Sequence, residues 1–195
     1  MGLMSNGTTI FDNGAMAVGG SMVFISSATA SASASIEFTL GDYKEYKFFF
    51  VNIHGSVNTA DLTFNLSSDS GSNYNVTKTT TVFRSFHYED NSIALLQYYA
   101  GNDLAQGTGF QTISDAVGTG SDENLCGTMQ IFNPSSNTYV KHFVGRYQHT
   151  IRNSLGSDEF YVAGYANTTS ALTNVKFQFN SGNIDDGKIL MFGLN

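Results

Sequence analysis

The four histidines are the first candidates for chemistry, and their spacing does not match a metal or catalytic motif. They stand at His54, His87, His142 and His149, and no pair has the spacing of a helical zinc motif. His142 and His149 are seven residues apart, so on one continuous strand their side chains would point to opposite faces. We therefore expect ordinary hydrogen-bonding histidines.

The single cysteine, Cys126, cannot form an intrachain disulfide, which is typical of a chain that folds in a reducing cytosol. A nucleophilic cysteine needs a base nearby in space. Cys126 stands beside an apolar strand candidate, which favours a small buried side chain. The serine motif G-x-S-x-G does not occur. The sequence therefore predicts no catalytic residues and no enzyme.

Pairs of adjacent carboxylates lie close to predicted turns, at Glu89-Asp90, Asp122-Glu123, Asp158-Glu159 and Asp185-Asp186. Carboxylates beside backbone carbonyls can bind Ca²⁺, and the nearest approach to a calcium loop is residues 183–187. Because the EF-hand spacing is missing, we expect a solvated turn and no metal. Asp185 and Asp186 are the weak candidates for metal ligands. No nucleotide-binding glycine motif occurs, so no cofactor is expected.

Several tyrosines near predicted turns are candidates for ligand contact. Tyrosine is large and stiff and has a polar tip, so it suits both interfaces and plain surfaces, and both uses stay open here. The candidates are Tyr74, Tyr88, Tyr98, Tyr99 and Tyr147.

Composition limits the partners of the chain. Charged residues make up 13% of the 195 residues, against about 25% in average proteins, and the formal net charge is -7. The nine Lys and Arg residues are scattered, whereas phosphate binding needs clustered positive charge. No apolar run approaches the roughly 20 residues that span a bilayer, and no basic segment marks a secretory signal. We expect neither nucleic acid nor membrane as a partner.

Two-residue alternation of apolar and polar side chains recurs from residue 36 onward, as in Ile36-Phe38-Leu40 and Val175-Phe177-Phe179. Such alternation predicts strands with one buried face, and turn signals separate the runs. The expected fold is all-β, an antiparallel β-sandwich of the jelly-roll type over residues 35–195. The pattern of residues 91–103 is compatible with a helix, a strand or a loop.

Residues 1–34 differ from the rest, because they are small, glycine- and serine-rich and nearly uncharged. We expect an extended N-terminal arm that packs against another subunit, with a disordered leader carrying one tethered strand as the alternative. The scarcity of charge and proline also leaves edge strands unprotected, so neighbouring subunits are expected to cover them. The expected anchoring residues are Ile10, Phe11, Met16, Val18, Met22 and Phe24.

Several segments resemble uncharacterised virion structural proteins of marine bacteriophages that infect cyanobacteria and SAR11-type hosts. The resemblance covers most of the chain and implies a β-sandwich without catalytic residues. The segments that carry it are Ser5–Gly14, Gly20–Ile25, Asp42–Tyr46, Phe132–Ser136, Phe179–Asp185 and Gly187–Gly193.

The resulting hypothesis is a capsid decoration, or cement, protein on the virion surface, made in the host cytoplasm and anchored by its arm. Its expected partners are copies of itself, as a homo-oligomer such as a trimer, and the major capsid protein. The alternative is a tail-fibre or receptor-binding module that recognises host glycans through loop residues. A glycan-degrading enzyme is the third hypothesis, without any acid–base pair to support it.

Overall fold

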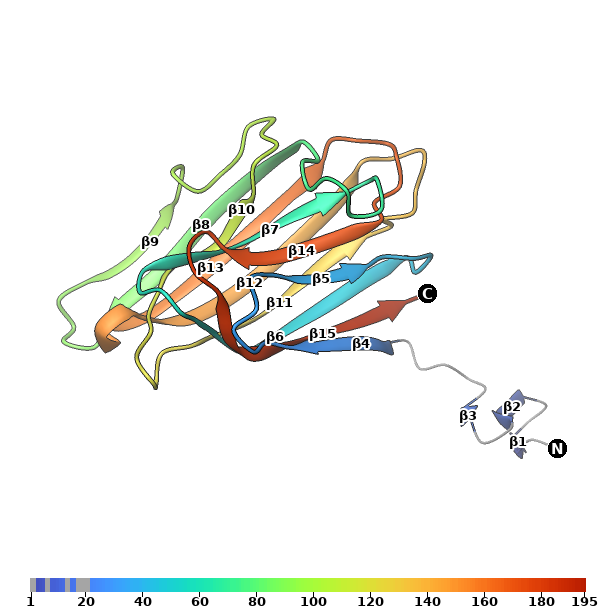
Figure 1. Cartoon of the computed structure of the whole chain (residues 1–195), viewed down its shortest axis with the longest axis horizontal. Helices are drawn as coiled ribbons and strands as arrows, with labels where there is room; N and C mark the ends of the chain where they lie inside the picture. The colour runs from blue at the N-terminus through green and yellow to red at the C-terminus, as the bar shows by residue number, and fades with distance from the viewer. Residues whose placement is uncertain (1–2, 6–7, 13–14, 17–21) are drawn as a thin grey trace.

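The computed structural model describes residues 3–5, 8–12, 15–16 and 22–195. The fold is all-β and antiparallel, as the alternation predicts, and its layers form a sandwich that is nearly closed into a barrel (Figure 1). Over these residues the only helical element is a 3-10 turn, Arg152–Ser154. None of the described helical residues forms a segment long and apolar enough to cross a membrane.

Eight strands form one layer, called here the large sheet. Neighbouring strands are antiparallel throughout. In spatial order they are β4 (Val23–Thr29), β15 (Ile184–Leu194), β6 (Glu45–Gly55), β11 (Leu125–Phe132), β12 (Lys141–Ile151), β13 (Gly156–Ala166), β8 (Lys78–Tyr88) and β9 (Ala94–Tyr98).

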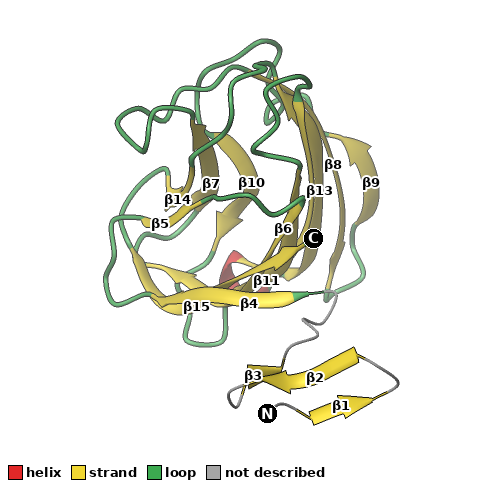
Figure 2. Ribbon diagram, turned by 90° about the vertical axis from the view of Figure 1, so that its right-hand side faces the viewer, coloured by secondary structure: helices red, strands yellow, loops and turns green. Residues whose placement is uncertain are grey.

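Four strands form the opposing layer, the small sheet. A single pair, Val117 with Ile151, joins β10 to β12 and so connects the two layers. Figure 2 shows the small sheet facing the curled large sheet across the core. The order is β10 (Gln111–Val117), β7 (Ala60–Ser67), β14 (Asn174–Phe179) and β5 (Ile36–Thr39).

Aromatic rings fill the space between the layers. Phe177 of the small sheet lies with its ring centroid 5.0 Å from that of Phe50 and 5.5 Å from that of Phe48, both on β6. These contacts are edge-to-face, the arrangement that ring quadrupoles favour. The predicted alternation is confirmed at β5, where Ile36 and Phe38 are buried and the residues between and after them are exposed. Apolar burial on this scale is the main stabilising contribution to the fold.

Two buried lysines bond to amide and backbone carbonyl oxygens rather than to carboxylates. The Lys78 ammonium donates to Asn65 Oδ1 at 2.5 Å and to the Val76 carbonyl at 2.8 Å. Lys141 donates to two backbone carbonyls, the nearer being that of Ser170 at 2.7 Å. Burial lowers the pKa of Lys78 to about 8, because the charged form loses solvation.

The N-terminal residues divide into two parts. β1 (Leu3–Ser5), β2 (Thr8–Asp12) and β3 (Ala15–Met16) form a separate three-stranded antiparallel sheet. β4, by contrast, pairs along β15, and the backbone of Ser33 exchanges hydrogen bonds with that of Ile184. The expected arm of residues 1–34 therefore contains an edge strand of the large sheet, and residues 22–34 belong with the sandwich.

The ambiguous segment 91–103 contains a strand, β9, followed by a loop. Its helix-like spacing of apolar residues arises because both faces of this short edge strand carry large side chains. Leu95 and Leu96 point to opposite faces, and both are exposed.

Candidate functional site

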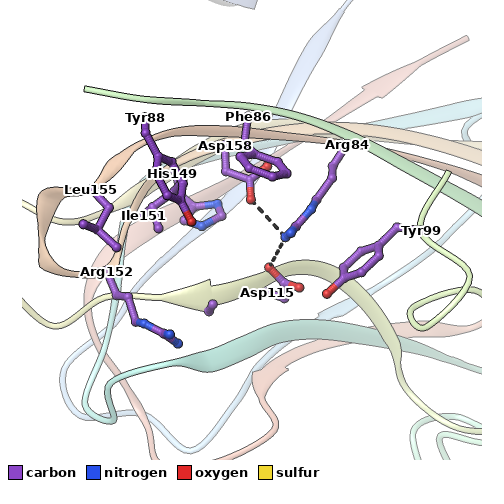
Figure 3. Close-up of a pocket in the computed structure, with 11 residues that line it drawn as sticks. Arg84, Phe86, Tyr88, Tyr99, Asp115, His149, Ile151, Arg152, Leu155 and Asp158 are labelled. Carbon is purple, nitrogen blue, oxygen red and sulfur yellow. Dashed lines mark hydrogen bonds and ion pairs between the residues drawn. The ribbon is translucent and has the colours of Figure 1, made fainter. Parts of the chain in front are cut away.

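A polar cavity lies between β8 of the large sheet and β10 of the small sheet. The backbone of β10 pairs with the large sheet only at Val117, and a cavity of about 200 Å³ lies next to this pair, with Ala116 and Ile151 in its lining (Figure 3). The lining residues are Arg84, Phe86, Tyr88, Tyr99, Asp115, Ala116, His149, Ile151, Arg152, Leu155 and Asp158.

Arg84 connects the two layers across this cavity. Its Nη1 atom donates to Asp115 Oδ1 at 3.1 Å and to Asp158 Oδ2 at 3.2 Å. The guanidinium carbon also lies 4.4 Å from the ring centroid of Tyr99 and 4.8 Å from that of Phe86. Charge-assisted hydrogen bonds and cation–π contacts together fix the position of this side chain.

Three polar atoms at the cavity have no hydrogen-bond partner in the structure. They are Arg84 Nε, His149 Nε2 and Asp158 Oδ1, and among the described residues no other buried side-chain nitrogen or oxygen shares this property. Leaving a buried polar group unpaired costs about 1–3 kcal/mol. Water cannot reach these atoms in the structure, so they lower the stability of the folded protein.

Burial shifts the pKa values of two cavity residues in opposite directions. Burial, together with the Asp115 charge, raises the pKa of Asp158 to about 6, against the opposing effect of Arg84. Burial and the Arg84 charge lower the pKa of His149 to about 4. At neutral pH the imidazole is therefore uncharged, while the Asp158 carboxylate is mostly ionised.

Ser114, His149 and Asp158 have the residue types of a nucleophilic triad but not its geometry. Ser114 Oγ bonds to His149 Nδ1 at 2.8 Å, and the serine is fully buried. His149 Nε2 bonds to no carboxylate. A triad needs an accessible hydroxyl on one imidazole nitrogen and an orienting carboxylate on the other, so this arrangement holds the histidine in place and presents no nucleophile.

Two of the five predicted ligand-facing tyrosines, Tyr88 and Tyr99, line the cavity. Tyr98 precedes Tyr99 but lies on the opposite face of the sheet, where it is 55% exposed and donates to Asp103. Neighbouring residues on an extended chain point to opposite faces, which explains why only one of this pair reaches the site.

The other two tyrosines lie away from the cavity. Tyr74 is at the surface, where its hydroxyl donates to Glu37 Oε2 at 2.7 Å. Tyr147 is 1% exposed and packs in the core, with its ring centroid 5.4 Å from that of Phe50. The expectation that Tyr147 faces a ligand is therefore wrong, because the hydrophobic core covers its ring.

From the sequence, Asp158 is expected only as a carboxylate near a predicted turn, and Arg84, Asp115 and Arg152 are not identified, although a signal exists for Arg84 and Asp158. In β8, Arg84 follows Val82 and precedes Phe86 in the series of residues that point inward. In β13, Asp158 precedes Phe160 in the corresponding inward series. A charged residue at an inward position must be buried or partly buried, and it needs partners there.

The weak metal candidates lie in another part of the molecule. Asp185 Oδ1 bonds to His54 Nδ1 at 2.7 Å, and Asp186 Oδ1 accepts from the Gly187 amide at 2.7 Å. Burial lowers the pKa of His54, but the Asp185 carboxylate outweighs this effect and raises it. Within the described ranges, no three His, Cys, Asp or Glu side chains gather as metal ligands.

The second candidate surface is the outer face of the large sheet, the face turned away from the core. Aromatic rings meet toward its two sides. On β4, β15 and β6, the ring centroids of Phe24 and Phe49 lie 5.5 and 5.4 Å from that of Phe192, and on β8 and β13, Phe83 stacks on Tyr161 at 4.7 Å. Its large apolar and aromatic side chains are Phe24, Phe49, Val51, Phe83, Leu96, Tyr98, Val144, Tyr161, Leu190 and Phe192.

Charges on this outer face nearly balance. The strands place three cations and three anions there: Lys47, Arg146, Lys188, Glu45, Glu159 and Asp186. Arg146 and Glu159 form an ion pair on neighbouring strands. The formal net charge of -7 is therefore carried by the rest of the molecule.

The expected anchoring residues are described only in part. Met22 and Phe24 are 43% and 54% exposed at the start of the large sheet. Ile10 and Phe11 lie in β2 and Met16 in β3. Val18 lies outside the described residues.

Cys126 lies half-buried on the outer face of β11, so the expectation of a buried core position is wrong. Its sulfur accepts from the Asn52 amide at 3.3 Å.

Comparison with known proteins gives no match to a protein-family model and none to a curated protein.

Proposed function

We propose that this chain is a structural protein of a bacteriophage particle, a capsid decoration protein that assembles through the outer face of its large sheet. The observation that carries the proposal is the set of aromatic and apolar side chains that stay exposed to solvent toward both edges of this face. Leu96, Tyr98 and Phe24 are 69%, 55% and 54% exposed. Groups of exposed large apolar side chains mark interaction sites in proteins that otherwise bury such groups.

Second copies of the same chain are the partners that fit this face best. Chains with a net charge of -7 repel each other, and the repulsion is smallest where the outer face is nearly neutral. The edge strand β9 adjoins this face and contains no charge and no proline, the two usual protections against strand pairing. Closed symmetric homo-oligomers are the common form of soluble assemblies, and we expect a trimer, in which each interface joins two different patches of the chain.

Attachment to the major capsid protein is assigned to the segment before β4. Met22, which directly precedes β4 and is 43% exposed, gives this segment an apolar base. An extended segment of small residues can add to the sheet of a neighbouring protein through backbone hydrogen bonds. The sandwich would then lie outward on the virion surface.

Labelling of phage particles with an antibody against this protein tests the proposal. Even labelling of the head supports a decoration protein, and labelling confined to tail or fibres contradicts it. A deletion of residues 1–21 tests the anchor, because it leaves β4 in place, and incorporation into particles should be lost. A deletion of residues 1–34 would also remove β4 from the large sheet, so it would confuse anchoring with folding.

A further inference from the structure

The large sheet ends in two open edge strands that differ in sequence. Among the described strands, β4 pairs only with β15 and β9 only with β8, so each leaves one side open (Figure 1). Neither β4 nor β9 contains a charged residue or a proline. The free edge strand of the small sheet, β5, by contrast carries exposed Glu37. Charge and proline are the usual protections against pairing with another chain, so the open edges of the large sheet are the unprotected ones.

The open side of β9 presents a row of backbone donors and acceptors. The carbonyl of Ile93, directly before β9, and the amide of Tyr99, directly after it, both bond to β8. Along an antiparallel strand, successive residues turn their N–H and C=O groups alternately toward and away from the neighbouring strand. The backbone groups of Ala94, Leu96 and Tyr98 therefore point to the open side, and all three residues are exposed.

The open side of β4 presents a matching row. The amide of Ala30 donates to the carbonyl of Gly187 at 2.9 Å, which fixes the alternation where β4 pairs with β15. By that alternation, the backbone groups of Ser27 and Thr29 point away from β15, and both residues are exposed. Backbone donors and acceptors of this kind bond either to water or to another strand.

The number of strands sets the relative direction of the two edges. The large sheet has eight strands, and all neighbours are antiparallel, so β4 and β9 run in opposite directions. Copies related by rotation about an axis along the strands therefore bring β9 of one and β4 of the next together as antiparallel neighbours. The outer faces then continue into each other, and the large side chains of Leu96 and Tyr98 meet the small side chains of Ser27 and Thr29.

We propose that β9 of one copy pairs with β4 of a second copy, so that the large sheets of neighbouring protomers join into one antiparallel sheet. This inference rests on the proposed self-association and identifies its interface. It supplies the two different patches that each interface of a closed trimer joins. Because both strands are uncharged, the contact adds no direct charge repulsion between chains with a net charge of -7.

Disulfide cross-linking between copies tests the pairing. In a Cys126→Ser background, double variants replace Ser27 or Thr29 together with Ala94, Leu96 or Tyr98 by cysteine, which covers the registers that the two rows allow. Side chains directly opposite each other on paired strands have Cβ atoms about 4.5–5.5 Å apart, close enough for a disulfide after a small adjustment. Under mild oxidation, at least one double variant should give a covalent trimer on a denaturing gel, and each single-cysteine variant should stay monomeric there.

Two results of this experiment would overturn the proposal. A covalent dimer from Leu96→Cys alone would show that β9 pairs with its own copy, which is the isologous arrangement of a two-fold dimer. The absence of a cross-link in every double variant of a self-associating protein would show that the two edges do not meet.

A proline on the open side of β4 tests the backbone hydrogen bonds separately. Ser27→Pro removes a donor that points away from β15, and edge strands tolerate proline at such positions. It should raise the dissociation constant of the oligomer by about tenfold or more, measured by sedimentation. Ser27→Ala is the matched control, because it shortens the same side chain, keeps the N–H group and should associate like the wild type. Equal association of the two variants would contradict strand pairing.

These outcomes distinguish the strand pairing from the proposed function. A wild-type chain that self-associates without cross-linking at these edges contradicts the pairing alone. A chain that stays monomeric at every concentration contradicts the self-association on which both depend.

Discussion

His149 of β12 and Asp158 of β13 lie directly opposite each other across the two strands, and both are buried at the cavity. Their pKa values are shifted toward each other's usual range. Asp158 has a pKa raised from 3.8 to about 6, and His149 has a pKa lowered from 6.5 to about 4. The two shifts have opposite effects on stability.

The sign of each effect follows from proton binding. Folded Asp158 holds its proton more tightly than the unfolded chain does, so this group adds stability as the pH falls from about 6 toward 3.8. Folded His149 binds its proton more weakly, so this group removes stability as the pH falls from 6.5 toward 4. Each shift corresponds to about 3 kcal/mol, and the two contributions nearly cancel.

Asp158→Asn should remove the contribution of Asp158 to the pH dependence of stability, so that the opposite contribution of His149 is no longer cancelled. When the pH is lowered from 6.5 to 4, the free energy of unfolding of this variant should decrease by about 3 kcal/mol more than that of the wild type. Urea unfolding at several pH values measures the difference in slope. Asp42→Asn, at an exposed loop position, is the control and should keep the wild-type slope. Equal slopes in wild type and Asp158→Asn would show that the two titrations do not oppose each other.

Because of buried Lys78, the free energy of unfolding should rise as the pH is raised in alkaline solution. Its folded pKa of about 8 lies below the usual 10.5, so the unfolded chain binds more protons in this interval and stability rises with pH. Between pH 8 and pH 10.5 the wild type should gain about 3 kcal/mol relative to Lys78→Met. Urea unfolding across this interval measures it, and Lys188→Met, at an exposed lysine, should retain the gain. The same pH dependence in Lys78→Met as in the wild type would contradict the shift.

Gly145→Ala should destabilise the fold through a steric clash. A Cβ atom at this position would lie 2.6 Å from atoms of the Tyr147 ring, which is buried and packed against Phe50. Because the ring cannot move away, overpacking should cost about 1–3 kcal/mol, measured by thermal or urea unfolding. Gly109→Ala, where no atom lies within 4 Å of the added Cβ, is the control. A Gly145→Ala variant as stable as this control would show that the core accommodates the methyl group.

The fold class was predictable because period-two alternation is a local property of each strand. Ile36 and Phe38 are buried as predicted, and so are Val175 and Phe177 on the partner strand β14. The boundary of the arm was harder to place. The run of small residues after Phe24 gives little apolar signal, although β4 is held in the sheet by backbone hydrogen bonds to β15.

The cavity was not predictable in the same way, because it is built from strands that are distant in sequence. Arg84 is 31 residues from Asp115 and 74 from Asp158. Pairings of this kind depend on strand order, which alternation does not encode. Arg84 and Asp158 stand at positions of the alternation that point toward the core, which indicates that each is buried or partly buried. The alternation does not identify their partners.

Sedimentation equilibrium of the full chain tests the central claim most directly, since assembly through the outer face requires self-association. The wild type should form a closed oligomer, expected to be a trimer. Leu96→Ser, at the most exposed apolar position of that face, should shift it toward monomer. Tyr139→Ser, an equally exposed residue in a loop, should not. A wild-type chain that stays a monodisperse monomer at every concentration would contradict the account.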